Sequence, residues 1–485
     1  MTTLHKRYIV TLFIFLSFLN LNAQQIFEAS QVDHPAQPKG GIPTFLEFVR
    51  YNIQIPFVNR VKPIQGNVDV RGIIETDGTM SSLEVVNGLN EAANEEVLRI
   101  FKLFRAWVPA IKEGNSVRQY FNFTIQFPHV PLEGYKAADM AFDFYYDSFL
   151  RQTTKLEEAS YHLRIKVDDN GLPIDEIRWA EKKGKKWGKY EVIELKPVRL
   201  SADQTARMLD VNVDELEKYL GDSEAYALVL GLNSFKTHFP EYVITQNRRV
   251  VKEIVPGEHD KVFYANGQTA RIRLYEGGAI TQTMAWYPNS ILKEKYYTET
   301  LSNGEEIDKI IALNDSTGKA LLVNGNGEIT EAGFKWGIGR IESGFLYGTW
   351  KLTSPAGEKI EEEYERSRLL EGKRWVGDQV INYTELVVYP SFEGGDDKMY
   401  RFLAQNIKYP MEAARAKKQG RVVISFVVDR DGTISDLGII NNIDPDLDKE
   451  ALRIVRLTSG KWKPGIKRGL PVPMRYSLPI NFELK

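Results

Sequence analysis

The feature that most constrains this chain is an internal duplication. The segment from Gly40-Gly41 to Phe127 runs in register with the segment from Gly394-Gly395 to Phe482. The matching landmarks are Pro56 with Pro410, Gly66 with Gly420, Asp77-Gly78 with Asp431-Gly432, Leu98-Arg99 with Leu452-Arg453, and, after one extra residue in the later copy, Trp107 with Trp462. Because the spacing is kept through turn-forming and aromatic positions, composition cannot explain the match. Each copy is therefore expected to be one folding unit.

The length of the chain predicts several domains. At 485 residues it is too long for one ordinary core, which favours three or four domains. Hydrophobic residues make up 43% and charged residues 26%, as in globular proteins. The net charge of −2 provides no field that would attract nucleic acid or an anionic membrane, so neither is an expected partner.

The N-terminus is typical of a secretory signal peptide. Lys6 and Arg7 precede an apolar run from Tyr8 to Leu19, and a polar stretch that ends at Ala23 follows. The run is shorter than the roughly 20 residues of a membrane-spanning helix. We therefore predict a signal peptide over residues 1–23 and a soluble periplasmic protein. The alternative is an uncleaved N-terminus that anchors the chain in the inner membrane. Because the sequence contains no Cys, neither a lipid-modified Cys nor a disulfide can form.

The later copy shows the order of secondary structure most clearly. A first helix is predicted between Gly395 and Tyr409-Pro410, where apolar residues recur at helical spacing. The stretches RVVISFVVD and TISDLGIIN flank a turn and predict a hairpin. Acidic residues from Asp444 favour the start of a second helix, after which Trp462 is expected to close the core. A last strand over 471–482 should lie at a sheet edge, because its prolines cannot donate hydrogen bonds to a neighbour.

These motifs carry a family resemblance. FEGG, NIKYP, QGRVVISFVVDRDGTISD, LDKEALRIV, KWKPG and SLPINF occur in that order over about a hundred residues, and together they resemble the C-terminal domain of the TonB family in its Bacteroidetes-type form. The earlier copy, with PKGG, NIQIP, QGNVDVRGIIETDGTMSS, NEEVLRIF, AWVPA and FNFTIQF, resembles the same domain more loosely. It departs from the pattern where Pro464-Gly465 becomes Pro109-Ala110.

The resemblance implies both a fold and a function. It implies an α+β protein in which each TonB C-terminal-like domain is a three-stranded antiparallel sheet with two helices. In TonB such a domain captures an extended segment of an outer-membrane transporter, which adds as a strand beside the last strand. The partner-binding edge strand would then include Val472, Arg475, Tyr476, Ser477 and Asn481. The alternative is that prolines or another domain block this edge.

The same reasoning limits the kind of partner. A Pro-rich spacer and an uncleaved membrane helix, which an energy transducer needs, are both missing from the sequence. We therefore expect a periplasmic binding protein whose partner is an outer-membrane transporter or another envelope protein. A homodimer through edge strands is the further alternative, since an exposed edge can pair with a second copy.

The middle of the chain is predicted to be rich in hairpins. VFYANGQTARIRLY, MAWYPNSILKEKYY, LLVNGNGEITEAGF and GTWKLTSPAGEKIEEEY each pair two runs across a turn, and they resemble MORN-type repeats. Upstream, YHLRIKVDDNGLPIDEIRW predicts another hairpin, and Ser201 caps a helix expected to reach Tyr219. The predicted domains are a signal peptide at 1–23, a degenerate TonB C-terminal-like domain at 38–128, an uncharacterised α+β segment at 129–257, MORN-like β-hairpin repeats at 258–375 and a TonB C-terminal-like domain at 383–485.

A basic group supports an alternative function. Lys461, Lys463, Lys467 and Arg468 lie close together in the sequence, where basic residues outnumber acidic ones from Val388 onward. A solvated turn is one interpretation. Contact with an anionic wall polymer, which would make the protein an envelope scaffold on peptidoglycan, is the other.

The sequence provides no catalytic motif. His34, His129, His162, His238 and His259 are far apart, and there is no HExxH, no G-x-S-x-G, no P-loop and no Cys. The acidic string from Asp444 to Glu450 imitates a calcium loop but has Lys449 and Val455 where Gly and an acid are needed. A non-enzymatic protein with no cofactor and no metal is therefore expected.

Overall fold

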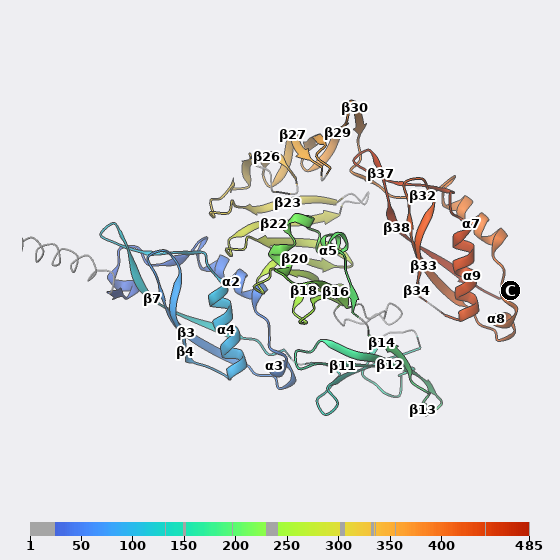
Figure 1. Ribbon diagram of the computed structural model, residues 1–485, viewed down its shortest axis with the longest axis horizontal. Coiled ribbons are helices and arrows are strands. Elements are labelled where there is room, and N and C mark those ends of the chain that lie inside the picture. The colour runs from blue at the N-terminus through green and yellow to red at the C-terminus, as the bar shows by residue number, and fades with distance from the viewer. Residues whose placement is uncertain are drawn as a thin grey trace, which may run out of the picture. The chain divides into compact units, whose positions relative to one another are not determined.

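The computed structural model describes residues 25–130, 132–148, 152–195, 197–228, 241–300, 306–330, 334, 336–354, 356–441 and 443–484 (Figure 1). These residues belong to two compact units. The first takes them from 25–298 and 311–320, and the second from 299–310 and 321–484. The expected signal peptide at 1–23 lies outside the described residues. Within the described ranges, no helix combines the length and apolar character needed to cross a bilayer.

The later copy is a small antiparallel sheet covered by helices. In chain order its main elements are α7 (Gly395–Asn406), α8 (Met411–Arg415), β33 (Gly420–Val428), β34 (Ile434–Asn441), α9 (Pro445–Arg456) and β38 (Met474–Phe482). The sheet order is β34-β33-β38. Apolar side chains of α7 and α9 share one buried core with the inward residues of β33 and β38. The α+β class predicted from the sequence is confirmed.

Short strands complete this domain. They are β31 (Val387–Val388), β32 (Ser391–Phe392), β35 (Trp462–Lys463), β36 (Gly465–Lys467) and β37 (Leu470–Val472). β32 pairs with β35, and β36 pairs with both β31 and β37. The segment before α7 and the segment after α9 are therefore held together by the pairing of β32 with β35.

Local sequence explains the main boundaries of the later copy. The Asp444 carboxylate accepts a hydrogen bond from the Asp446 backbone N–H at 3.0 Å, and Pro445 takes the first helical position of α9. Between β33 and β34, Gly432 has a φ of +80°, and a Cβ there would clash with the carbonyl oxygen of Trp462. The turn therefore requires glycine.

The earlier copy repeats this arrangement. Its main elements are α2 (Gly41–Asn52), α3 (Phe57–Val61), β3 (Gly66–Ile74), β4 (Met80–Asn87), α4 (Glu91–Leu103), β6 (Ala110–Lys112) and β7 (Asn115–Phe127). The short strands β2 (Gln37–Pro38) and β5 (Trp107–Val108) pair with each other. One strand has no counterpart in the sheet of the later copy: β1 (Ile26–Phe27) lies beside β7, so that the sheet order is β1-β7-β3-β4.

An identical ion-pair clamp fixes the helices in both copies. Arg99 donates to Glu96 and, at 2.6 Å, to the carbonyl oxygen of Asn52 at the end of α2. Arg453 likewise donates to Glu450 and, at 2.7 Å, to the carbonyl oxygen of Asn406 at the end of α7. The clamp satisfies a helix-terminal carbonyl that has no partner within its own helix. It also explains why the arginine, Arg99 or Arg453, occurs in both halves of the sequence.

A seven-stranded sheet follows the earlier copy. Its strands are β8 (Tyr135–Lys136), β9 (Ala141–Tyr146), β10 (Gln152–Thr153), β11 (Tyr161–Val167), β12 (Pro173–Lys183), β13 (Lys186–Trp187) and β14 (Glu191–Glu194). β11 and β12 form the hairpin predicted from YHLRIKVDDNGLPIDEIRW.

Two antiparallel meanders make up the rest of the middle. The nine-stranded sheet contains, in chain order, β15 (Val198–Arg199), β16 (Ala225–Leu228), β17 (Glu241–Thr245), β18 (Val250–Val255), β19 (His259–Phe263), β20 (Thr269–Glu276), β21 (Ala279–Trp286), β22 (Leu292–Thr300) and β23 (Glu306–Leu313). The second meander contains β24 (Leu322–Val323), β25 (Asn326–Ile329), β26 (Ile338–Glu342), β27 (Phe345–Thr353), β28 (Lys359–Glu365), β29 (Arg368–Val376) and β30 (Gln379–Tyr383).

The meanders place the expected domain limits inside sheets. The limit at 257/258 falls between the paired strands β18 and β19, and the limit at 375 falls within β29. The core of the earlier copy also continues into Ile272, Met284 and Trp286 of the nine-stranded sheet. Turn signals located the hairpins, but they could not show where one sheet ends.

The helix predicted from Ser201 to Tyr219 is interrupted. Ser201 caps α5 (Ala202–Leu209), which stops because Asp210 adopts a left-handed conformation with φ +56°. A short turn, η2 (Val213–Glu215), and α6 (Glu217–Leu220) follow.

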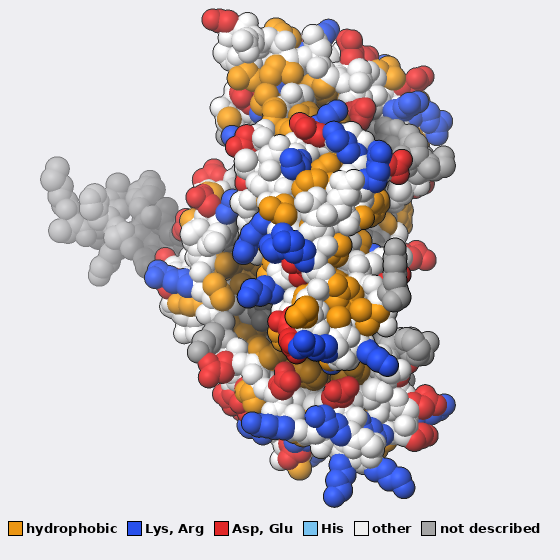
Figure 2. Space-filling model, turned by 90° about the vertical axis from the view of Figure 1, so that its right-hand side faces the viewer, with side chains coloured by type: hydrophobic (Ala, Val, Ile, Leu, Met, Phe, Trp, Pro, Cys, Tyr) orange, Lys and Arg blue, Asp and Glu red, His pale blue; other side chains and the backbone are white. Residues whose placement is uncertain are grey.

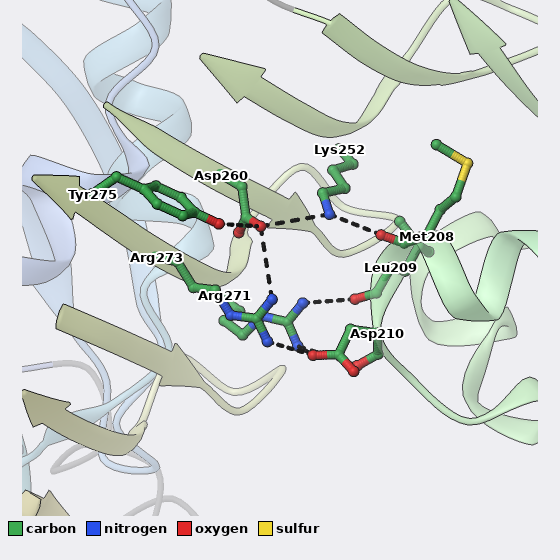
Figure 3. A network of polar contacts seen from close by, with 8 residues as sticks. All are labelled: Met208, Leu209, Asp210, Lys252, Asp260, Arg271, Arg273 and Tyr275. Carbon is green, nitrogen blue, oxygen red and sulfur yellow. Dashed lines mark hydrogen bonds and ion pairs between the residues drawn. The ribbon is translucent and has the colours of Figure 1, made fainter. Parts of the chain in front are cut away.

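Cationic side chains from the nine-stranded sheet stabilise the end of α5 (Figure 3). Lys252 donates to the Met208 carbonyl oxygen at 2.8 Å, and Arg271 donates to that of Leu209 at 2.7 Å. Asp260 lies 3.5 Å from the Lys252 ammonium group, and burial lowers the pKa of Lys252. The two cationic side chains donate to carbonyl oxygens that have no hydrogen-bond partner within the last turn of α5. The network therefore has a structural role.

Candidate functional site

β38 is an edge strand of the later copy. It pairs antiparallel with β33, from Met474 opposite Val428 to Phe482 opposite Gly420. Within the part of the chain that the structure describes, no strand lies on its other side. An edge strand exposes a row of backbone donors and acceptors that an added strand can pair with.

The alternation of β38 shows which backbone groups face the open edge. Leu478, Ile480 and Phe482 are buried, whereas Ser477 and Asn481 are exposed. Alternate residues of a strand direct their backbone groups to the same side. Pro479, which has no N–H, belongs to the set that contains Arg475, Ser477 and Asn481. Because proline is tolerated where a strand needs no donor, this set faces the open edge and the buried set faces β33.

Tyr476 belongs to the buried set. Its ring centroid lies 4.8 Å from that of Trp462 and 5.8 Å from that of Phe426, and burial raises the pKa of its hydroxyl. Its backbone stands opposite Phe426 in the ladder with β33. Tyr476 therefore helps to fix β38 on the core and does not contribute backbone groups to the open edge, in contrast to the sequence prediction.

Val472 also differs from the prediction. It lies in β37, opposite Gly465 of β36, and Pro473 separates it from β38. The strand predicted as continuous over 471–482 is thus two strands with different partners, because a proline at the junction cannot continue a ladder. The open edge starts after Val472.

Arg475 contributes a cross-strand contact on the exposed face of the sheet. Its guanidinium donates to the Ser425 hydroxyl at 2.8 Å and pairs with the Asp436 carboxylate of β34. The side chain thus bridges all strands of this sheet while its backbone faces the edge. Of the five predicted residues, Arg475, Ser477 and Asn481 occupy the open edge.

Comparison with known families identifies both copies. The family model of the Gram-negative bacterial TonB protein C-terminal domain matches residues 56–128 and 405–484. Both copies belong to the TonB C-terminal domain family. The matches leave out most or all of α2 and α7, although both helices belong to the duplicated unit. The TonB match does not extend over residues 129–404, and the resemblance of the hairpins there to MORN-type repeats stays a prediction.

Solved structures and curated proteins add little to this assignment. Two solution structures of the Helicobacter pylori TonB C-terminal domain match at 21% and 23% identity, each over 18% of this chain and over 79% and 92% of their own length. Both have a TM-score of 0.16. No curated protein matches. TonB family proteins are located in the cell envelope, and their C-terminal domains are non-catalytic and generally interact with outer-membrane transporters.

The basic residues of the second TonB domain, the later copy, do not act as one group. Lys461, Lys463 and Lys467 are all exposed, and the Lys461 ammonium lies 5.4 Å from the centroid of the Phe402 ring. Arg468 donates at 2.6 Å to Glu362, a carboxylate of β28 with no exposed surface. Figure 2 shows Lys and Arg side chains interspersed with acidic and apolar ones on the face that it draws. Arg468 is therefore removed from the predicted anionic contact.

The first TonB domain, the earlier copy, holds a feature that sequence reasoning missed. β1 pairs in parallel with β7 at Ile26 opposite Arg118 and Phe27 opposite Gln119. Two residues are too few to show a period, and a parallel pairing across about ninety positions leaves no local signal. The last strand of this domain is therefore partly covered, unlike β38.

A polar cluster around His162 was also missed. His162 contacts Asp143 at 2.9 Å through Nε2 and Tyr190 through Nδ1, and Arg164 donates to the same carboxylate at 2.8 Å. Burial acts against ionisation of Asp143, but the hydrogen bonds from His162 and Arg164 outweigh it and lower the pKa of this carboxyl. Burial raises the pKa of Tyr190, so this hydroxyl is not an activated nucleophile. Across the described ranges, no group of three or more His, Asp or Glu residues could hold a metal ion.

Proposed function

We propose that this protein is a non-catalytic periplasmic binding protein. Its second TonB domain binds an extended segment of an outer-membrane partner by adding that segment as a strand beside β38. The observation that carries the proposal is the open edge of β38, where the backbone groups of Arg475, Ser477 and Asn481 pair with no other strand among the described residues.

The core of the domain supports this proposal. Leu478, Ile480 and Phe482 hold one face of β38 on the helices with 1–3% of their surface exposed. The receiving strand is therefore fixed before the partner arrives, which reduces the entropy lost on binding. Pro479 interrupts the row of donors, so a bound segment would pair mainly with Arg475 and Ser477 on one side and Asn481 on the other.

The proposed location rests on the sequence. Residues 1–23 have the order of a cleavable signal peptide, and the family is found in the cell envelope. N-terminal sequencing of the mature protein should give Gln24. A chain that keeps Met1 and stays in the inner membrane would instead support the anchored alternative.

Replacing Ser477 with proline tests strand addition. The substitution removes one N–H donor from the open edge and none from the ladder with β33, so the domain should melt as before. We expect affinity for the partner to fall by about 1–3 kcal/mol, roughly 5-fold to 150-fold. The readout is binding to detergent-solubilised outer-membrane proteins, measured for the full mature chain.

Ser477→Ala is the matched control, because it removes the same side chain and keeps the N–H. It should bind like the unchanged protein. Equal binding by a folded Ser477→Pro chain would show that this edge does not receive the partner. If the chain proves dimeric and Ser477→Pro makes it monomeric, the added strand comes from a second copy.

Peptidoglycan binding through the basic residues is the weaker alternative. Arg468 pairs with Glu362, which leaves Lys461, Lys463 and Lys467 as the exposed cations of the group. A wall-binding scaffold would lose its ligand when these three lysines are replaced by alanine, and Ser477→Pro would not change its binding.

A further inference from the structure

In the first TonB domain the edge equivalent to β38 is already occupied. Gln119 of β7 pairs with Ile74 of β3 on one side and with Phe27 of β1 on the other. β1 therefore lies on the outer edge of the last strand. We name residues 26–36 the N-terminal strap. The strap begins with β1 and then runs beside the hairpin that β6 and β7 form, where His34 bridges to Ile111.

The strap is held by one aromatic anchor and polar contacts. Phe27 is 9% exposed, and the Lys112 ammonium lies 4.5 Å from the centroid of its ring. Lys112 also donates to the Gln31 carbonyl oxygen at 2.9 Å. Glu28 lies 3.5 Å from the Arg71 guanidinium. An apolar side chain followed by a carboxylate is thus the pattern that the edge accepts.

The duplication provides an internal comparison. His34 bridges to Ile111 in the first domain, and the equivalent Val388 pairs with Ile466 in the second. Upstream the two copies differ. The residues equivalent to Ile26 and Phe27 are Val380 and Ile381, which lie in β30 and pair with β29. The strand that covers the edge in the first copy therefore belongs to a different sheet in the second.

The strap covers only the beginning of the edge. After Phe27 the chain turns away in a short helical turn at Ala29–Gln31. Tyr120, Asn122, Thr124 and Gln126 then follow on the outward-facing set of β7, without the proline that interrupts β38. Within the described residues no strand pairs with this stretch on the outer side. A longer segment could gain pairings here that the strap does not make.

The contacts of the strap are also weak enough to exchange. The Arg71–Glu28 pair is exposed at 41% and 52% of the two side chains, and exposed ion pairs contribute little to stability. Phe27 is the strap's one nearly buried apolar side chain. Loss of this anchor would release β1 while leaving the core of the first domain in place.

We propose that the first TonB domain is a second strand-accepting site whose edge is partly covered by the chain's own strap. The strap competes with an external segment of the same chemistry, a bulky apolar residue followed by a carboxylate in extended conformation. An external segment that also pairs along Tyr120 to Gln126 displaces it. This site lies on a different strand from the proposed partner edge, so it does not depend on what β38 binds.

The test uses the strap as its own probe. A synthetic peptide of residues 25–36 is titrated into the full mature chain and into a chain that lacks residues 24–36. We expect the shortened chain to bind one peptide and the full chain to bind none. The same peptide with Phe27→Asp should bind at least about tenfold more weakly, because the apolar anchor is lost. Ser477→Pro should leave this binding unchanged, which separates the two sites.

If the shortened chain does not fold, a full-length variant with Phe27→Asp tests whether β1 can be released from β7. Phe27→Asp should speed amide hydrogen exchange at Arg118 and Tyr120, whose N–H groups face β1, by at least about tenfold, with the α4 amides still protected. Val86→Asp is the matched control, because Val86 is 64% exposed on β4 of the same domain. It should change neither the exchange of the β7 amides beside β1 nor the protection of the α4 amides. A folded shortened chain that ignores the peptide would overturn the proposal. So would a Phe27→Asp chain whose whole first domain unfolds, since the strap would then be a structural element.

Discussion

Replacing Trp462 with alanine is expected to lower the free energy of unfolding of the second TonB domain by about 3–5 kcal/mol. Trp462 is 3% exposed and packs against Phe392, Phe426 and Tyr476 with ring centroids 4.8 to 5.6 Å apart. Its indole N–H donates to the Thr458 hydroxyl at 3.0 Å. The substitution removes a large buried ring and leaves this hydroxyl without its donor.

The measurement is amide hydrogen exchange along α9 in the full chain, which reports opening of this domain alone. Tyr400→Ala is the control, because that side chain is 54% exposed on α7 of the same domain. It should change exchange very little. A Trp462→Ala chain with unchanged protection and lost partner binding would mean that Trp462 is a contact residue and not a core residue.

Replacing Arg468 with methionine is expected to cost about 3–5 kcal/mol, because it leaves a buried carboxylate without its cation. The Glu362 side chain has no exposed surface, and Arg468 donates to it at 2.6 Å. Tyr364 and Tyr383 donate to the same carboxylate at 2.9 and 2.6 Å, and burial together with Glu362 raises the pKa of both hydroxyls. The cluster joins the β36–β37 hairpin to the second meander.

A double variant distinguishes charge from packing. Glu362→Gln combined with Arg468→Met removes both charges, so much of the lost stability should return in denaturant unfolding. Arg475→Met is the matched control: its pair with Asp436 is exposed at 54% and 68%, and its loss should cost at most about 1 kcal/mol. Equal costs for the two arginines would show that the buried pair contributes no more than a surface pair.

Local patterns in the sequence predicted much of each TonB domain. The turn at Asp431-Gly432, the acidic start of α9 and the packing of Trp462 follow from conformational preference and apolar spacing. These are short-range rules, and the duplication tested them twice. The outward position of Ser477 also followed, because strand alternation and the proline constraint apply within a single strand.

Long-range contacts could not be predicted. The Arg468–Glu362 pair joins residues 106 positions apart, and nothing in the local sequence of Arg468 distinguishes a solvated cation from a buried one. The pairing of Phe27 with β7 is also a contact between segments that are far apart in the sequence. Val472 was misplaced for a different reason: the apolar alternation continues through Pro473, but the hydrogen-bonded ladder does not.

The central claim is that a partner adds a strand to β38. Residue-resolved amide hydrogen exchange of the full chain, with and without the captured outer-membrane partner, tests this most directly. Strand addition predicts that binding slows exchange at Arg475, Ser477 and Asn481, while Leu478 and Ile480 are protected in both states. Unchanged exchange at these three edge amides, with new protection around Lys463 and Lys467, would contradict strand addition and favour the wall-binding alternative.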